Sequence, residues 1–273
     1  MPQDAQSDIR LVAVDLDGTL LNDSKQVTEQ PAAALACLPE RGVKLVIASA
    51  RPPRAVRHIY QELKLDTLQI NYNGALIWDE PNQQALFHRP LPGKLARSII
   101  DTARDMFEEV LITCEILDKW FTDRDDNTHT TETGRLFKPD FIGPVEQICA
   151  NPITKLMLLG EPRIILRLEA LLMEQFGKRV SILKTDRDLL QIMDNRVSKA
   201  TSLQLIAQHY GVPMQNVMAI GDAPNDVGML QSAGVSIAMD NAHELVKDAA
   251  DWIAPSNNDH GVHAALQRYG LCP

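Results

Sequence analysis

The sequence predicts an α/β protein with a Rossmann-like core of parallel strands and an inserted α/β domain. Short apolar runs that end in polar residues recur near both ends of the chain. Helical patterns separate these runs, as parallel strands joined by crossover helices require. The stretch 84–192 has strands and helices of its own. We therefore expect a core formed by residues 1–83 and 193–273, and an inserted domain formed by residues 84–192.

Each expected element follows from its pattern. Near-continuous apolar runs indicate strands buried on both faces of a sheet, and apolar residues at spacings of three and four indicate helices. Gly42 and Gly211 close two of the helices. In the core we expect strands at 9–16, 43–48, 68–70, 217–222, 235–239 and 252–254, with helices at 28–41, from Pro52, and at 199–211.

The inserted stretch shows the same two patterns in a different order. We expect strands at 109–116, 120–122, 153–159, 180–184 and 189–193, and helices at 92–106 and 161–176. The polar stretch 123–134 is expected to be an exposed loop or a strand edge. The aromatic residues Trp120 and Phe121 are expected either to pack in the core of this domain or to line a substrate pocket.

Composition excludes several classes of protein. The chain has 273 residues and a net charge of −9, whereas proteins that bind nucleic acid through bulk charge are usually basic.

No apolar run approaches the roughly 18 residues that span a bilayer. The first eight residues lack the basic and apolar regions of a signal peptide. The four cysteines are far apart in the sequence, which is typical of unpaired thiols in a reducing compartment. We therefore expect a cytoplasmic protein.

The strongest chemical signal is the pair Asp15 and Asp17, directly after the first strand. In an open parallel sheet, ligands bind beyond the carboxyl ends of the strands. Two carboxylates there repel each other and any anionic substrate unless a cation is bound. Oxygen ligands suit a hard divalent cation, above all Mg²⁺. The alternative is a polar turn with no ligand.

Three further segments place polar groups at the same edge of the sheet. Asp222 and Asp226 follow another buried strand, so Asp222 is expected to join Asp15 around one metal ion. Ser49 ends a third strand before a helix, where a hydroxyl and free N–H groups form a phosphate seat. Lys199 begins a helix and offers a cation. The alternatives are an N-cap for Ser49 and a solvated surface position for Lys199.

Together these segments resemble the haloacid dehalogenase superfamily, and more narrowly its Cof-type phosphatases, which carry a large α/β cap after the third core strand. The resemblance covers nearly the whole chain. The first and fourth motifs are specific as a pair, and the other two are specific only in their company. The four matching motifs are Asp15-Leu16-Asp17-Gly18-Thr19-Leu20-Leu21, Ala48-Ser49-Ala50-Arg51, Val197-Ser198-Lys199 and Gly221-Asp222-Ala223-Pro224-Asn225-Asp226.

The resemblance implies roles for these residues. Asp15 would attack phosphorus and form an aspartyl-phosphate, and Asp17 would protonate the leaving alkoxide and later take a proton from water. Mg²⁺ would be held by Asp15, Asp222 and the backbone carbonyl of Asp17. Asp226 would bind the metal through water or orient Lys199. The groups implied to hold the phosphoryl oxygens are Ser49, Lys199, Asn225 and the backbone N–H groups of Leu16 and Ala50.

The sequence departs from the family pattern at Ala50 and Ala200, where glycine is usual, and alanine restricts the backbone there. Arg51 is expected either to reach the substrate or the cap, or to form a structural ion pair. The implied substrate is a small phosphorylated metabolite, and the expected protein is a monomer or homodimer. Two alternatives stay open: a phosphomutase, and a non-catalytic regulatory protein on the same scaffold.

Overall fold

The computed structural model describes residues 8–126, 128, 129, 131 and 133–273. The chain divides into two compact units, one made of residues 1–86 and 198–273 and the other of residues 87–197. The residues ahead of position 8, on which the expectation of no signal peptide rests, lie outside the described residues. Within the described part, no helix has both the length and the apolar character needed to cross a membrane.

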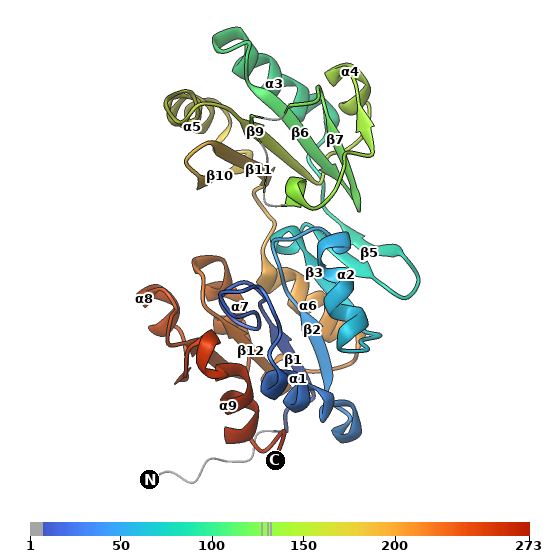
Figure 1. Cartoon of the computed structure of the whole chain (residues 1–273), viewed down its shortest axis with the longest axis vertical. Coiled ribbons are helices and arrows are strands. Elements are labelled where there is room, and N and C mark those ends of the chain that lie inside the picture. Colours follow the sequence, from blue (N-terminus) through green and yellow to red (C-terminus); the bar gives the residue numbers. More distant parts are fainter. Residues whose placement is uncertain (1–7, 127, 130, 132) are drawn as a thin grey trace. The chain divides into compact units, whose positions relative to one another are not determined.

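The first unit is built on a parallel sheet in which β1 lies between β12 and β2 (Figure 1). Its strands are β1 (Leu11–Val14), β2 (Lys44–Ile47), β12 (Val217–Gly221), β13 (Val235–Met239) and β14 (Trp252–Ala254), in the order β14-β13-β12-β1-β2. All four pairings are parallel. In the register, Val14 lies opposite Ile220 of β12 and Ile47 of β2. Three strands therefore end together around Asp15.

A smaller antiparallel sheet continues from this one. It contains β3 (Leu68–Asn71), β4 (Leu76–Asp79) and β5 (Gln84–His88) in chain order. A bridge between Ala48 and Ile70 joins β3 to the end of β2. The strands β4 and β5 were not predicted, although Leu76, Ile77 and Trp78 form a short apolar run in β4; β5 is exposed or half-buried along its length.

The described residues of the first unit form these α-helices: α1 (Glu29–Ala36), α2 (Pro53–Glu62), α6 (Lys199–His209), α7 (Val227–Ser232), α8 (Glu244–Lys247) and α9 (Gly261–Arg268). Helix α1 packs on α9, and α6 packs on α7. The connection from β1 to β2 runs toward one edge of the sheet, and the connection from β12 to β13 runs toward the other edge. Because such crossovers are right-handed, α1 and α7 cover opposite faces of the sheet. The prediction of one helix over 28–41 was wrong at its end. Pro39 cannot donate to the helical ladder, so α1 stops at Ala36 and a 3-10 turn follows.

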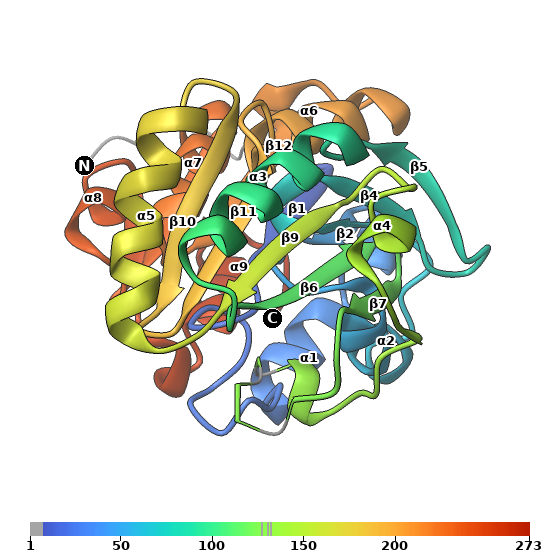
Figure 2. The same cartoon turned by 90° about the horizontal axis from the view of Figure 1, so that it is seen from above.

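The second unit is a six-stranded sheet with helices α3 and α5 over one face (Figure 2). The strands are β6 (Leu111–Ile116), β7 (Lys119–Thr122), β8 (Phe141–Ile142), β9 (Lys155–Leu159), β10 (Val180–Asp186) and β11 (Leu189–Asp194). The helices are α3 (Gly93–Met106), α4 (Val145–Ile148) and α5 (Pro162–Phe176). One apolar cluster joins the helices to the sheet, and the predicted α/β fold class is confirmed.

Alternate residues along the strands of the second unit face opposite sides of its sheet. On β6, Ile112 and Cys114 belong to the cluster under the helices. Their neighbours Thr113 and Glu115 therefore face the other side, and both are buried. Of the polar stretch 123–134, predicted to be an exposed loop or a strand edge, Asn127, Thr130 and Glu132 lie outside the described residues.

Candidate active site

Two acidic residues meet at the carboxyl ends of the adjacent strands β1 and β12. Asp15 directly follows β1 and is 5% exposed, and Asp222 directly follows β12. The backbone N–H of Asp15 donates to the carbonyl of Ile220 at 3.0 Å, so the pairing extends up to the acids themselves. Gly18, at φ +83°, passes so close that a Cβ there would lie 2.4 Å from Oδ2 of Asp222. Only glycine fits this approach.

Lys199 is buried between two of the carboxylates. Its ammonium Nζ lies 2.5 Å from Oδ1 of Asp15 and 2.6 Å from Oδ1 of Asp226, and the residue is 1% exposed. Lys199 is the first residue of α6, and Ser198 caps that helix by accepting the N–H of Thr201 at 3.1 Å. The start of α6 therefore fixes the lysine beside the acids, and the surface alternative for Lys199 is wrong.

Asp226 is held by a set of hydrogen bonds that uses both of its carboxylate oxygens. Oδ2 accepts the backbone N–H groups of Asp222 at 3.1 Å and of Ala223 at 3.0 Å. Oδ1 accepts from Lys199, and the residue is fully buried. Of the two roles implied for Asp226, this geometry supports the orientation of Lys199.

The charges of the cluster do not balance. Three carboxylates share one ammonium, which leaves a formal excess of two negative charges. Burial raises the pKa of Asp15 well above its usual range despite Lys199, and Asp226 adds to the rise. Burial also raises the pKa of Asp222. Burial alone would lower the pKa of Lys199, but Asp15 and Asp226 reverse this and raise it. The excess matches the charge of a divalent cation.

The donor atoms fit such an ion. Oxygen atoms of Asp15, Asp222 and Asp226 lie within 4.8 Å of one another. All three are carboxylate oxygens, which hard cations such as Mg²⁺ prefer. The side chain of Asp17 is not part of this group among the described residues. The metal role implied for Asp17 through its backbone carbonyl stays a prediction.

The carboxylate of Asp17 instead forms ion pairs. Arg51 donates to it twice, from Nε at 2.7 Å and from Nη2 at 2.6 Å, and Lys25 donates from Nζ at 2.7 Å. Partial burial would raise the pKa of Asp17, but the hydrogen bonds from Arg51 and Lys25 outweigh it and lower the pKa. Asp17 is therefore held as a carboxylate, the form that accepts a proton.

The residues implied to hold phosphate are distributed around the same edge. Ser49 is buried at the end of β2, and its Oγ accepts the N–H of Arg51 at 3.1 Å. The N-cap of α2 is Pro52, so the alternative of an N-cap for Ser49 is wrong. Asn225 is exposed, and its side-chain amide donates to Oδ1 of Asn73 at 2.8 Å. Leu16 is buried beside Asp15, and Ala50 is exposed. Neither Ala50 nor Ala200 has a positive φ, so alanine suits the backbone at both positions.

Other side chains fix the loop after β1. Thr19 donates from Oγ1 to Oδ1 of Asp222 at 2.7 Å. Asn241 donates to the carbonyl of Gly18 at 2.8 Å, and Asn257 to that of Leu21 at 3.0 Å. Thr19 lies within the first motif, so its position was a usable signal. Lys25 lies in a polar turn with no pattern that distinguishes it.

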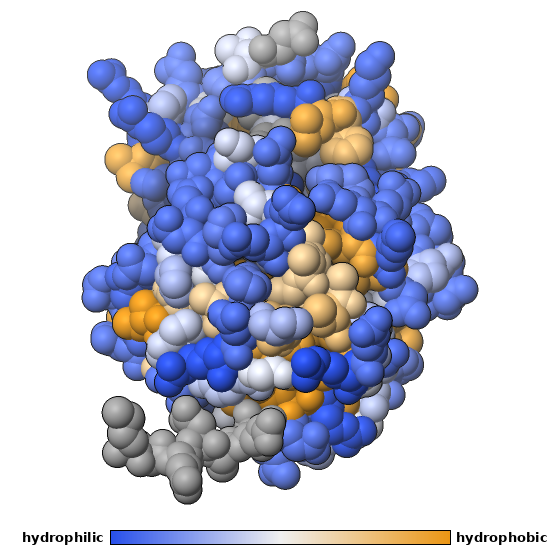
Figure 3. All heavy atoms as spheres, turned by 60° about the horizontal axis from the view of Figure 1, so that its bottom comes forward, coloured by the Kyte–Doolittle hydropathy of each residue, from blue (hydrophilic) through white to orange (hydrophobic). Residues whose placement is uncertain are grey.

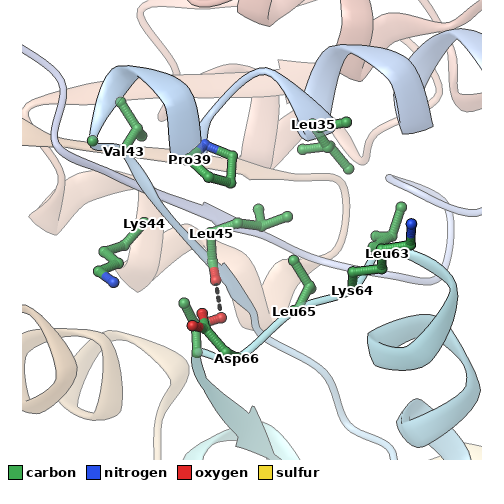
Figure 4. Close-up of a pocket in the computed structure, with 12 residues that line it drawn as sticks. Leu35, Pro39, Val43, Lys44, Leu45, Leu63, Lys64, Leu65 and Asp66 are labelled. Atoms are coloured by element: carbon green, nitrogen blue, oxygen red, sulfur yellow. Dashed lines mark hydrogen bonds between the residues drawn. The ribbon is translucent and has the colours of Figure 1, made fainter.

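An apolar hollow lies away from the acids, at the amino ends of the strands. It has a volume of about 330 Å³ and is lined largely by aliphatic side chains such as Leu35, Val43 and Leu65, with Lys44 and Asp66 among them (Figure 4). Figure 3 shows apolar side chains gathered among hydrophilic ones on the surface drawn there. The hollow lies at the opposite ends of the strands from Asp15 and shares none of its residues.

Nearly the whole chain matches a known family. Residues 12–266 match the haloacid dehalogenase-like hydrolases. A haloacid dehalogenase-like hydrolase from Bacteroides thetaiotaomicron has a similar structure, with a TM-score of 0.86 and 26% identity over 95% of this chain and 99% of that one. The chain belongs to the haloacid dehalogenase-like hydrolases, as its motifs predicted.

The similar proteins with named activities are phosphatases. An HMP-PP phosphatase of Cronobacter sakazakii is 30% identical, over 85% of each chain. A 5-amino-6-(5-phospho-D-ribitylamino)uracil phosphatase of Bacillus subtilis is 29% identical, over 97% of each chain. The predicted enzyme class, a phosphatase of the haloacid dehalogenase type, is confirmed.

The close approach of Gly18 to Asp222 can be tested by adding one methyl group. We expect Gly18→Ala to displace Asp222 and to lower phosphatase activity by about 10²-fold, because a misplacement of about 1 Å has that effect in an active site. Gly42→Ala is the matched control. Gly42 has φ +69°, and a Cβ at that position would have no other atom within 4 Å, so it tests strain without a clash. Equal activity in the two variants would contradict the assignment.

The excess negative charge can be tested through stability. The folded pKa of Asp222 is raised, so the folded state is penalised once pH exceeds the ordinary value of 3.8. Asp222→Asn removes this penalty, and we expect the Tm at pH 7 in EDTA to rise by roughly 2–4 °C for each ~1 kcal/mol relieved. The gain shrinks as pH falls toward 3.8.

The same Tm measurement also tests whether the acids bind Mg²⁺. Mg²⁺ is expected to raise the Tm of the wild-type protein more than that of Asp222→Asn, because a ligand that binds only the folded state stabilises it. Asp248→Asn removes an acid outside the cluster and should change neither quantity. A lower Tm for Asp222→Asn in EDTA, or an equal response to Mg²⁺, would show that the acids are not under electrostatic strain.

Proposed function

We propose that the protein hydrolyses phosphate monoesters of small metabolites, with Mg²⁺, through an aspartyl-phosphate on Asp15. The observation that carries the proposal is the buried contact between Asp15, at the end of β1, and Lys199, at the start of α6. A carboxylate at this position is oriented by a fixed cation and lies where open α/β sheets bind ligands. The phosphatase activities of the similar proteins support the same reaction class.

In the first step a carboxylate oxygen of Asp15 attacks phosphorus. A bond forms between that oxygen and phosphorus, the bond from phosphorus to the ester oxygen breaks, and the alkoxide leaves with the electron pair. Asp17 gives the alkoxide a proton. A dehalogenase expels halide and needs no such proton, so the acid at position 17 favours phosphate esters.

In the second step water attacks the phosphorus of the aspartyl-phosphate. Asp17, now a carboxylate, takes a proton from this water, and Asp15 is released. Arg51 and Lys25 lower the pKa of Asp17 and keep it ionised, which is the form that this step needs, whereas the proton donation of the first step has to proceed against these contacts. The proton that Asp17 gains serves the leaving group of the next turnover.

Asp15 and Asp222 are the proposed ligands of Mg²⁺, with the backbone carbonyl of Asp17, and Asp226 faces the same space. When bound, the ion offsets the repulsion between the carboxylates and the phosphate and stabilises charge on the phosphoryl oxygens. Lys199 supplies a second positive charge from the side of α6. Ser49, Asn225 and the N–H groups of Leu16 and Ala50 are the proposed donors to the remaining phosphoryl oxygens.

The inserted unit, which corresponds to the predicted cap, is proposed to select the substrate. Its sheet has helices on one face, and the other face carries the buried polar pair Glu115 and Lys155, opposite each other on β6 and β9. Trp120 also lies on that side, and its indole donates to Thr113. Phe121 instead packs in the apolar cluster under the helices.

We expect the enzyme to work in the cytoplasm, which four free cysteines support.

The nucleophile is tested by replacing one oxygen. We expect Asp15→Asn to abolish phosphate release from p-nitrophenyl phosphate and from a panel of phosphorylated metabolites, measured with Mg²⁺ and with EDTA. Asp101→Asn removes an exposed acid of α3 and should retain full activity. Turnover by folded Asp15→Asn would remove Asp15 from its role. A requirement for a bisphosphate activator would identify a phosphomutase. No phosphate release from any ester would favour the non-catalytic regulatory protein.

The selecting role of the second unit predicts a change of preference. We expect Glu115→Gln to alter the ranking of metabolites in the panel while p-nitrophenyl phosphate, which needs few contacts, is hydrolysed at the wild-type rate. The matched control is Glu174→Gln, an exposed residue of α5. An unchanged ranking in Glu115→Gln would place substrate selection elsewhere.

A further inference from the structure

Arg51 holds the carboxylate of Asp17 by both oxygens. Nε of Arg51 donates to Oδ2 at 2.7 Å, and Nη2 donates to Oδ1 at 2.6 Å. This two-point contact fixes the plane of the carboxylate as well as its distance, which a lysine cannot do. The Arg51 side chain is 16% exposed, so its contact with Asp17 is screened less than a surface ion pair.

The backbone around Arg51 is fixed in turn. Its N–H donates to Oγ of Ser49 at 3.1 Å. Its carbonyl accepts from the side chain of Asn71 at 3.2 Å and from the N–H of Tyr72 at 3.4 Å. The guanidinium is thus presented from a segment tied to the ends of both β2 and β3. A side chain anchored in this way can orient a neighbour.

Lys25 contacts the same carboxylate from the other direction. Its backbone has φ +59°, a left-handed conformation that is rare for lysine and that persists only where its surroundings impose it. Asn22 imposes it here, since its carbonyl accepts the N–H of Lys25 at 2.9 Å and its Oδ1 accepts the N–H of Gln26 at 3.0 Å. The turn directs Nζ of Lys25 to Oδ1 of Asp17.

We propose that Arg51, with a smaller contribution from Lys25, is a positioning residue that orients Asp17 for proton transfer. The inference rests on the proposed function, in which Asp17 is the acid and base. The side chain of Asp17 is 37% exposed, so without these contacts we expect it to sample other rotamers in the turn after β1. The contribution of Lys25 is smaller because its side chain is 48% exposed and its contact is single.

A double-mutant cycle tests this directly. We expect Arg51→Gln to lower kcat by about 10²-fold with KM unchanged, because a misoriented catalytic group loses rate and not binding. In the Asp17→Asn background the same change should cost nothing further, since a residue that acts only through Asp17 has nothing left to orient. Arg51→Lys should recover little, because it keeps the charge and loses the two-point contact.

Two results would overturn the inference. A rise in KM as the main effect of Arg51→Gln would make Arg51 a substrate-binding residue. An equal fold-loss in the wild-type and Asp17→Asn backgrounds would show that it acts independently of Asp17. Lys25→Met gives a second cycle at an exposed position, should Arg51→Gln fold poorly. It is expected to lose less than Arg51→Gln, and again nothing in the Asp17→Asn background.

The controls separate this inference from the proposed function. Arg57→Gln removes another arginine from the same region, one that pairs with Glu80 at 2.5 Å, and should leave kcat unchanged. If wild-type protein hydrolyses no phosphate ester, the proposed function fails before the cycle begins. If wild-type protein is active and Asp15→Asn is not, an additive cycle rejects only the role of Arg51.

Discussion

The parallel pairing of β1 with β12 is the constraint on which the site depends. It joins segments about 200 positions apart in the sequence, so that Asp15 and Asp222 end up on neighbouring strands. Their repulsion is offset in part by Lys199, which α6 places between Asp15 and Asp226. The cluster still carries excess negative charge. A fold that buries such charge is stabilised when a divalent cation binds, and binding and folding are then linked.

The site contains two kinds of acid, although all four are aspartates. Asp15 and Asp222 are buried among other carboxylates, and burial raises the pKa of each. Asp17 lies two positions further on and faces two cations instead, which lower its pKa. Groups whose surroundings move their pKa values apart are suited to different tasks. The site therefore separates a cluster of buried carboxylates that can hold a cation from a single carboxylate, Asp17, that two cations hold in place.

Much of the site was predictable because its motifs lie at strand ends. Apolar runs located β1, β2 and β12, and the topology of parallel sheets brings their carboxyl ends together. The contacts of Arg51 and Lys25 were not predictable in this way. They depend on side-chain rotamers and on the left-handed turn at Lys25, and neither produces a periodic pattern in the sequence. The early end of α1 follows from Pro39, and it could have been predicted from the sequence because proline interrupts a helix.

The phosphoryl group is proposed to be transferred to Asp15, and the most direct measurement identifies the residue that carries it. Asp17→Asn protein would be mixed with p-nitrophenyl phosphate and Mg²⁺, quenched, and reduced with borohydride, which converts an aspartyl-phosphate to homoserine. p-Nitrophenolate leaves without a proton from Asp17, so the first step proceeds in this variant, and loss of the base in the second step should let the intermediate accumulate. We predict homoserine at position 15 by peptide mass spectrometry. Turnover with unmodified Asp15, or with the label on another residue, would contradict the claim.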